Sequence, residues 1–307
     1  MAGTLVVGFV FVDIKGFPVG RYNPRGRNLG KVSFIHGGVA RNVAETIAGG
    51  GMPVTFASLT EDTAIGNDVV RRLASRGVDT SCMMTVPSEG IGQWMVILNE
   101  KGDVAGEISC PPSVEALEAL IKDKGEDMIR ASDNVVIEID TSAELSERVI
   151  SLCKRHHKPV YTVVGNMSVI LSRRDLVASL DCFVCNEVEA GRLFDADLSS
   201  HTPDEMLDIL RENFPSVGCS AMVITMGEKG AVYIDGKSGD KGWCPPIPTK
   251  LVDSTGAGDA FLSGTVMGLT KGMTLSSAVR LGTLLAHRTI QTTESTAEPD
   301  HSVFDKM

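Results

Sequence analysis

The segment Asp253-Ser-Thr-Gly-Ala-Gly-Asp259 combines small residues with a carboxylate directly before a helical pattern. Gly256, Ala257 and Gly258 let a backbone approach a ligand closely, and the unpaired N–H groups of the following helix point at the same place. Such a turn is an anion hole that suits the charge on a transferring phosphoryl group. A carboxylate there repels phosphate, so we expect Asp259 to remove a proton from an attacking hydroxyl. A glycine turn with Asp259 as helix N-cap explains the segment equally well on its own.

A second glycine-rich segment, Gly37-Gly-Val-Ala-Arg-Asn42, also precedes a helical pattern. Gly37 and Gly38 would let a polyhydroxyl substrate come close to the backbone. The amide of Asn42 would offer both a donor and an acceptor to a vicinal diol. Alone this segment is weak, because two glycines before a helix are common. The two segments together are far more specific than either one.

Together the two segments resemble both signatures of the ribokinase (PfkB) family of carbohydrate kinases, in the right order and at the right separation. The resemblance covers essentially the whole chain. It implies an ATP-dependent kinase that transfers the γ-phosphoryl group to a primary hydroxyl of a nucleoside or sugar, with Asp259 as catalytic base. It also implies Mg²⁺ as cofactor and, as in many members, K⁺. The sequence has neither a Walker A pattern nor a strand-linked GxGxxG, which argues against a dinucleotide dehydrogenase.

The same resemblance assigns residues to the nucleotide and its metal ions. The string Asn186-Glu-Val-Glu189 matches the family element that orders Mg²⁺ and water around the phosphates, so Glu189 would hold Mg²⁺ partly through water. A polar helix start is the alternative explanation. The turn from Thr225 to Gly230 is similar to the one that holds the ATP phosphates and ribose. The residues implied for ATP are Asn186, Thr225, Gly227 and Gly230, those for K⁺ are Asp253 and Thr255, and the C-terminal helix with residues 292–299 would supply the adenine pocket.

On the acceptor side, the resemblance implies that Asp13, at the end of the first predicted strand, grips substrate hydroxyls together with Gly37, Gly38 and Asn42. Several strings, such as Val12-Asp-Ile-Lys-Gly16, are most similar to pseudouridine kinases. However, Phe11 stands where those kinases usually carry Asn, and losing a hydrogen-bonding group at a substrate wall changes specificity strongly. A pseudouridine 5'-kinase-like activity is the first hypothesis. Another sugar kinase, for ribose or fructose, and a non-catalytic nucleoside or sugar sensor are the alternatives.

Strand-like apolar runs alternate with helical patterns along most of the chain, which predicts an α/β protein with a mostly parallel sheet. The resemblance implies a ribokinase-like three-layer αβα fold with its site along the rim at the carboxyl ends of the strands. The predicted strands cover residues 4–10, 54–59, 134–139, 159–164, 182–185 and 222–226, and the predicted helices cover residues 39–48, 66–75, 142–156, 202–213 and 260–269.

Two stretches interrupt this alternation and predict a small β lid. Residues 13–36 are extended, and residues 90–112 flank the hairpin signal Asn99-Glu-Lys-Gly-Asp103. Inserted strands can close over a site, whereas an ordinary edge hairpin is the alternative. We therefore expect a single kinase domain over residues 1–307 with these two lid insertions. Because lid strands of the family often pair between subunits, a homodimer through the lid is also expected.

Composition limits the partners and the compartment. The formal net charge of −10 argues against a nucleic-acid partner, and no apolar run is long enough to cross a membrane. The N-terminus has no basic region and no cleavage signal, so we expect a cytoplasmic protein whose seven cysteines are reduced. Cys182 and Cys185 form a CxxC, which we interpret as a buried strand end and not as a metal or redox site.

Overall fold

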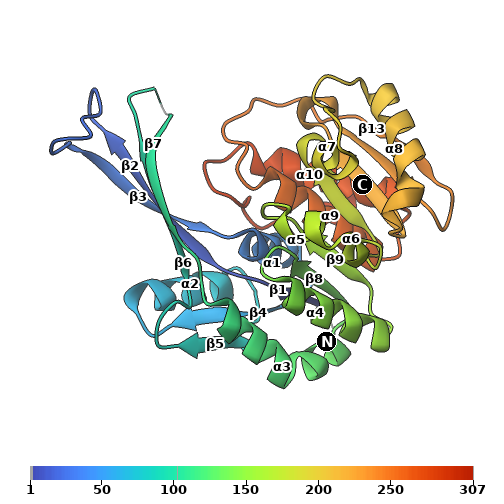
Figure 1. The fold of residues 1–307 in the computed structure, drawn as a ribbon, viewed down its shortest axis with the longest axis horizontal. Coiled ribbons are helices and arrows are strands. Elements are labelled where there is room, and N and C mark those ends of the chain that lie inside the picture. The colour runs from blue at the N-terminus through green and yellow to red at the C-terminus, as the bar shows by residue number, and fades with distance from the viewer. Residues whose placement is uncertain (1–2, 102, 307) are drawn as a thin grey trace.

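The central sheet runs through the whole protein in two hydrogen-bonded parts (Figure 1), in a computed structural model that describes residues 3–101 and 103–306. The first part is entirely parallel, with the order β5-β4-β1-β8-β9, and comprises β1 (Thr4–Val7), β4 (Val54–Glu61), β5 (Met83–Val86), β8 (Asn134–Glu138) and β9 (Val160–Val163). The second part has the order β10-β11-β12-β13 and comprises β10 (Phe183–Asn186), β11 (Ala221–Thr225), β12 (Ala231–Asp235) and β13 (Lys241–Cys244). A parallel bridge between Tyr161 and Cys182 joins the two parts, and β12 runs antiparallel to both of its neighbours, β11 and β13.

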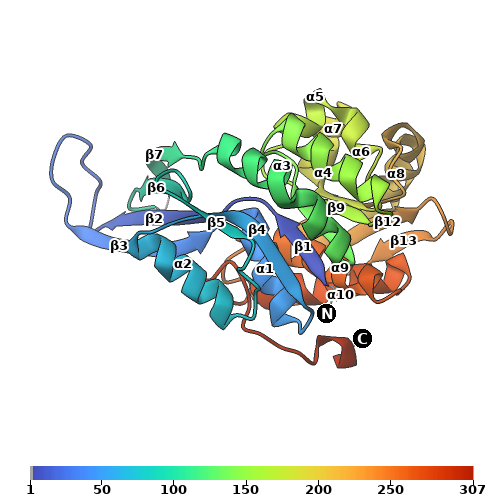
Figure 2. The same ribbon diagram turned by 90° about the horizontal axis from the view of Figure 1, so that it is seen from below.

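Helices cover both faces of this sheet, which confirms the expected three-layer fold (Figure 2). Leu5 and Val7 of β1 pack into one apolar cluster and Val6 packs into the other, because alternate side chains of a strand point to opposite faces. One layer contains α1 (Val39–Gly49), α2 (Ala64–Ser75), α9 (Ala257–Thr270) and α10 (Leu275–Thr289). The other contains α3 (Val114–Ala131), α4 (Ala143–Arg155), α5 (Ser168–Ser172), α6 (Arg174–Val177), α7 (Glu187–Phe194) and α8 (Pro203–Val217), and two 3₁₀ turns cover Gly227–Lys229 and Val303–Lys306.

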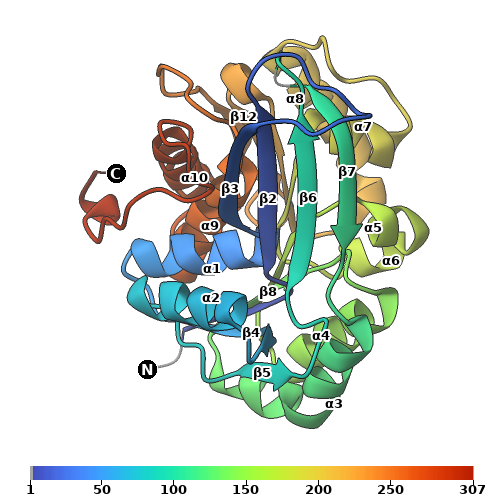
Figure 3. The same cartoon turned by 90° about the vertical axis from the view of Figure 1, so that its left-hand side faces the viewer.

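The lid is a separate four-stranded sheet with the order β3-β2-β6-β7, formed by β2 (Phe11–Pro18), β3 (Gly30–Gly37), β6 (Gly92–Leu98) and β7 (Val104–Cys110) (Figure 3). The expected hairpin between β6 and β7 is confirmed. Its turn is closed by Asn99, whose side-chain oxygen accepts the N–H groups of Lys101 and Asp103. The lid strand β2 follows β1 directly, so the lid extends from the same rim of the main sheet at which β1 ends.

Two predicted boundaries differ in the structure, and both lie near the site. The first strand ends at Val7 and not at residue 10. The next residue, Gly8, is closely packed, since a Cβ on it would lie 2.6 Å from a carboxylate oxygen of Glu138. Helix α9 begins at Ala257 and not at Ala260, because Gly256 serves as its N-cap. The helix α3 was not among the predicted elements, and α10 was named only as a C-terminal helix without bounds, although both pack apolar residues against the sheet.

The cysteines and the helices agree with the expectations from composition. Cys182 and Cys185 are 1% and 3% exposed at and within β10, which confirms the buried strand end. All seven cysteines are free thiols. Among the described residues, no helix has the length and apolar character that crossing a bilayer requires.

Candidate active site

Asp259 lies in the first turn of α9, and the backbone before it allows only glycine at one position. Gly256 has a left-handed conformation (φ 78°), and a Cβ on it would lie 2.0 Å from the carbonyl oxygen of Ser295. Because Gly256 itself caps the helix, the alternative of Asp259 as N-cap is wrong. The Ala257 N–H donates to the Ser254 carbonyl over 3.2 Å, whereas open space lies beside Gly258. The start of α9 at Gly258 is therefore open beside the chain, and the first-turn N–H groups of a helix favour an anion.

Asn42 joins the two sequence motifs in space. It comes from the first turn of α1, is 5% exposed, and its Nδ2 donates to Oδ2 of Asp259 over 2.7 Å. Its Oδ1 is buried and accepts no hydrogen bond from the described residues. A buried acceptor without a partner is costly, so a ligand hydroxyl at this point would be stabilised. The arrangement places a free acceptor and a carboxylate base beside each other.

Burial raises the pKa of Asp259 to about 7. The hydrogen bond from Asn42 and the positive charge of Arg41 act in the opposite direction, and the charge of Glu189 adds to the rise. A carboxyl group with a pKa near neutrality can accept a proton from a hydroxyl more readily than an ordinary Asp can. The electrostatics of the site thus suit a general base.

Glu138 is a site residue that the sequence interpretation missed. It is the last residue of β8, and its Oε2 accepts the Phe9 N–H over 2.9 Å. Burial and, to a lesser extent, the charges of Asp259 and Asp140 raise the pKa of Glu138 to about 7. An ionisable residue at the carboxyl end of an otherwise apolar strand was the signal that could have revealed it.

The two glycines before α1 are explained by packing within the protein. A Cβ on Gly37 would lie 2.6 Å from Oδ1 of Asp13, and a Cβ on Gly38 (φ 94°) would lie 2.7 Å from the Phe9 carbonyl oxygen. The space over Gly37 thus holds the Asp13 side chain, which lies at this end of the lid. Burial raises the pKa of Asp13, and Lys15 and Arg41 reduce that effect. A substrate contact of either glycine remains a prediction.

The nucleotide-side residues lie at the carboxyl ends of β10 and β11. Asn186 caps α7 in a reciprocal capping box: its Oδ1 accepts the Glu189 N–H and Oε2 of Glu189 accepts the Asn186 N–H, both over 2.8 Å. The polar helix start weighed as an alternative is therefore present. It leaves a second carboxylate oxygen on Glu189, so it does not exclude a role with Mg²⁺.

The turn after β11 borders a hollow of about 510 Å³. Gly230 (φ 89°) packs against Cys244, which lines the hollow: a Cβ on Gly230 would lie 2.2 Å from the Cys244 carbonyl oxygen. Gly227 (φ 55°) faces open space, and Thr225 donates through Oγ1 to the Cys185 carbonyl over 3.4 Å. The hollow is lined by Trp243, Cys244, Pro245, Pro246 and Ile247 and by Ser276, Arg280, Thr283 and Leu284 of α10.

The residues predicted for the nucleotide base and for K⁺ make contacts within the protein. The C-terminal helix α10 lines the hollow, whereas residues 292–299 lie against α1, α2 and the Gly256 turn. An adenine pocket formed by these two segments remains a prediction. Oδ1 of Asp253 accepts both the N–H and the hydroxyl of Thr255, over 2.9 and 2.7 Å. Although burial opposes it, these bonds lower the pKa of Asp253. A K⁺ ion at Asp253 and Thr255 remains a prediction.

The carboxylates of the site are compatible with a hard cation, although no group of three or more His, Cys, Asp or Glu side chains in the described ranges has a metal-binding arrangement. Burial raises the pKa of Glu189, and the charge of Asp140 adds to this. Such mutual repulsion is relieved by a cation between the groups. Mg²⁺ usually takes one or two protein carboxylates, with waters and substrate phosphates as its other ligands, so Glu189 fits this pattern.

Comparison with known proteins places this site in a family. The sequence profile described as "pfkB family carbohydrate kinase" matches residues 1–301. The chain belongs to the pfkB family. A guanosine-inosine kinase from Exiguobacterium acetylicum is 34% identical over 96% of both chains. A pseudouridine kinase from Escherichia coli is 25% identical over 97% of this chain and 93% of that one. A pfkB kinase is a phosphotransferase that acts on a sugar or nucleoside hydroxyl, so the chain is an enzyme and the sensor alternative is not supported.

Solved structures agree with this family at the level of the fold. The ribokinase of Arabidopsis thaliana, solved with ribose and ATP, superposes with a TM-score of 0.84 at 21% identity over 99% of this chain and 98% of that chain. The ribokinase of Thermotoga maritima gives a TM-score of 0.78 at 19% identity over 100% and 99% of the two chains. The ribokinase-like fold expected from the two motifs is thus confirmed.

Proposed function

We propose that this pfkB kinase transfers the γ-phosphoryl group of ATP to the primary 5'-hydroxyl of a nucleoside, with guanosine and inosine as the first acceptors to test and pseudouridine as the second. The observation that carries the chemistry is the Asn42–Asp259 pair, in which a buried base lies beside an unsatisfied acceptor. The order of acceptors rests on the guanosine-inosine kinase, which is more similar to this chain than the pseudouridine kinase is.

In the proposed reaction, the acceptor lies between the lid and the rim of the main sheet. Asn42 Oδ1 accepts a hydrogen bond from one sugar hydroxyl, and Asp13 and Glu138 bind others. Asp259 takes the proton of the primary hydroxyl as its oxygen attacks the γ-phosphorus, and the bond to the β-phosphate oxygen breaks to release ADP. The N–H groups of the Gly256–Gly258 turn stabilise the charge on the phosphoryl group, with Gly258 as the donor beside open space.

The nucleotide lies along the carboxyl ends of β10 and β11 in this proposal. Gly227 leaves room for phosphates beside Thr225, and the hollow next to Gly230 accepts the adenine against Trp243 and α10. Asn186 lies beside the phosphates in this proposal, and Glu189 would hold Mg²⁺ partly through water, where the bound metal would neutralise phosphate charge. K⁺ at Asp253 and Thr255 would stabilise the adjoining Gly256–Gly258 turn.

The lid surface favours a nucleoside over a free sugar. Trp94 pairs with Asp13 across β6 and β2, so both side chains lie on the same face of the lid. Lys15, on that face too, acts electrostatically on Asp253, which means that this face is turned toward the site. The indole N–H of Trp94 donates to Glu107 over 3.0 Å, which fixes the ring on this face. A nucleoside whose ribose is bound by Asp13 can stack its base on this indole.

The test is an acceptor panel with ATP and Mg²⁺ that contains guanosine, inosine, pseudouridine, uridine, ribose and fructose, with and without K⁺. ADP release gives kcat/KM, and phosphorus NMR of the product identifies the phosphorylated oxygen. We expect kcat/KM for guanosine or inosine to exceed that for ribose by about tenfold or more, the gain that base stacking provides. A preference for ribose or fructose would contradict the nucleoside assignment and leave the transfer chemistry intact.

We also propose that two copies pair through the opposite face of the lid. Phe34, Met95 and Ile108 form a cross-strand row on that face with Ile14 and are 63%, 46% and 70% exposed. An apolar row of this kind favours a partner surface of the same chemistry. Light scattering on the wild type and on Ile108→Asp tests the pairing: a dimer that becomes a monomer supports it, and a monomeric wild type contradicts it.

A further inference from the structure

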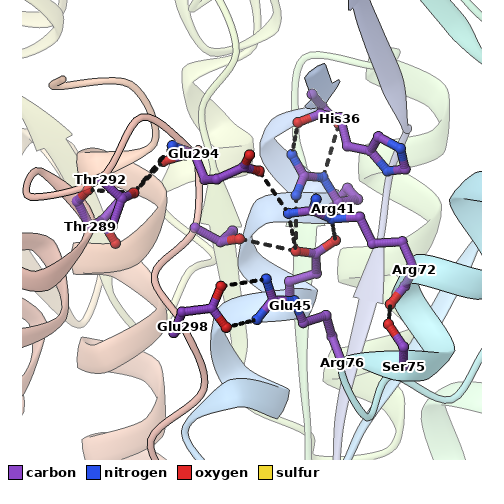
Figure 4. A network of polar contacts seen from close by, with 12 residues as sticks. His36, Arg41, Glu45, Arg72, Ser75, Arg76, Thr289, Thr292, Glu294 and Glu298 are labelled. Carbon is purple, nitrogen blue, oxygen red and sulfur yellow. Dashed lines mark hydrogen bonds and ion pairs between the residues drawn. The ribbon is translucent and has the colours of Figure 1, made fainter. Parts of the chain in front are cut away.

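A buried ion-pair cluster connects parts of the chain that are far apart in sequence, and no step of the proposed reaction uses it (Figure 4). At its centre, Nη1 of Arg41 and Oε2 of Glu45 are 3.1 Å apart, one turn from each other on α1. Both side chains are only 1% exposed. Desolvation of two charges is costly, and apolar residues often fill such a place with equal or better stability. The reason that two charged residues are buried here therefore has to come from the contacts of Arg41 and Glu45 with other segments.

Arg41 binds the end of the lid strand β3. Its Nε donates to the Gly37 carbonyl over 3.2 Å and its Nη2 donates to the His36 carbonyl. The planar guanidinium donates to both carbonyls, and its Nη1 lies within ion-pair distance of the Glu45 carboxylate without a hydrogen bond to it. The compact ammonium of a lysine does not reproduce the two-carbonyl fork. Gly37 is the residue on which Asp13 packs, so this arm determines where the lid wall meets α1.

Glu45 binds the segment of residues 294–296, which packs against the turn at Gly256. Its Oε2 accepts the Thr296 hydroxyl over 3.0 Å, and its Oε1 is 3.2 Å from Nε of Arg72. Arg72 in turn pairs with Glu294 over 3.1 Å. Between these two anchors lies Ser295, whose carbonyl oxygen fills the space over Gly256. This arm determines where the turn before Asp259 lies.

We propose that Arg41 and Glu45 are positioning residues. They hold the end of β3 (the lid wall) and the turn before Asp259 (the phosphate turn) in a fixed relation to Asn42, which lies next to Arg41 on the same helix turn. The inference rests on the proposed function, because it assigns one arm to acceptor binding and the other to the phosphoryl-transfer step. The arm to His36 and Gly37 supports acceptor binding, and the arm to Thr296 supports the orientation of Asp259. Small displacements of reacting groups reduce turnover strongly, so loss of either arm is measurable.

The two arms predict different kinetic changes. Thr296→Val removes one hydroxyl at nearly constant volume, and we expect kcat to fall about three- to tenfold, the value of one hydrogen bond, with the acceptor KM unchanged. Arg41→Met removes the arm to His36 and Gly37 and takes away the nearest positive charge of the buried Glu45 carboxylate. We expect it to raise the acceptor KM and to lower kcat by about tenfold or more. Arg41→Lys keeps the charge for Glu45 but not the fork, so kcat recovers while the acceptor KM stays raised.

Arg76→Met is the matched control. Arg76 pairs with Glu298 over 2.7 Å at the exposed edge of the same cluster, where Glu298 is 79% exposed. It contacts neither Glu45 nor the β3 carbonyls, so kcat and KM should stay within about twofold of the wild type, as for surface ion pairs. All variants are compared by circular dichroism and thermal unfolding, so that the kinetics are read on folded protein.

The outcomes separate this inference from the proposed function. Wild-type kcat and KM in a folded Thr296→Val and a folded Arg41 variant would overturn the positioning role, and so would an equal loss in Arg76→Met. If Arg41→Met does not fold, Thr296→Val and Arg41→Lys decide. A wild type that phosphorylates a sugar and no nucleoside contradicts the nucleoside assignment only, since the split between kcat and KM is then measured with that sugar. A wild type inactive on the whole panel removes both.

Discussion

The phosphate side and the lid side of the site are built in different ways. On the phosphate side, the groups that we propose for binding are backbone N–H groups, and residues such as Gly256 and Gly230 have positive φ angles with no room for a Cβ. On the lid side, the strands β2 and β6 present side chains on one face, among them Asp13, Lys15 and Trp94. A backbone site tolerates few substitutions because each one moves the chain. A side-chain surface can be altered residue by residue, so the lid is where this kinase can set its choice of acceptor.

The largest effect is expected at the residue that both sides share. Asp259→Asn should lower kcat by about 10²-fold or more, because the base is lost while the hydrogen-bonding shape remains. Turnover of guanosine and of ribose, each measured by ADP release, should fall by a similar factor, since the base acts on either acceptor. Near-wild-type turnover in the variant would remove Asp259 from the reaction.

The second effect tests the backbone side. Gly256→Ala forces a Cβ toward the Ser295 carbonyl, so we expect a loss of stability of about 2 kcal/mol or more and a decrease in kcat of about tenfold. Gly239→Ala is the matched control, because Gly239 is also left-handed (φ 76°) but has open space around it. That variant should lose about 1 kcal/mol and keep its turnover. Equal kcat values in the two variants would mean that the loss of turnover comes from backbone strain in general and not from a displaced turn before Asp259.

The third effect tests the lid side. Trp94→Ala should lower kcat/KM for the nucleoside by about tenfold through the loss of base stacking and leave kcat/KM for ribose nearly unchanged. Met95→Ala, one residue further on the other face of β6, should change neither. Equal losses for nucleoside and ribose in Trp94→Ala would indicate that the indole supports the lid and does not select the acceptor.

The smallest effect concerns Glu138, which lies where the two sides meet. Its raised pKa, about 7 against an ordinary 4.5, means that the unfolded chain loses this proton first as the pH rises. The stability that the protonated form provides is complete below about pH 4.5 and is lost as the pH passes 7. Glu138→Gln does not titrate and its oxygen can still accept the Phe9 N–H, so it should exceed the wild type by about 2 kcal/mol at pH 8 and match it at pH 4.

Denaturant unfolding at several pH values measures this difference, with the exposed Glu212→Gln as control. The control should follow the wild type at every pH. The measured quantity is the difference in unfolding free energy between Glu138→Gln and the wild type. If this difference is the same at pH 8 and at pH 4, the Glu138 carboxylate is well solvated and the prediction is wrong.

The sequence motifs predicted the alternating order of strands and helices and named most residues of the candidate site, because these features depend on local rules. The glycines before α1 and α9, the capping residue Asn186 and the hairpin signal at Asn99 each act within a few neighbouring residues. The interpretation of Gly37 and Gly38 as substrate contacts shows where local rules end. The neighbours that require glycine there are Asp13 and Phe9, more than twenty residues away in the chain.

From the sequence alone, the paired motifs around Asp259 and Asn42 predicted kinase chemistry through their resemblance to one family, although each motif on its own left a structural explanation open. The tertiary structure decided what surrounds that chemistry. It brought Asn42 to 2.7 Å from Asp259, added Glu138 from β8, and tied the lid to the phosphate turn through Arg41 and Glu45. These are contacts between residues far apart in the chain, and burial, which raises the pKa of Asp259 and Glu138, exists only when the chain is folded.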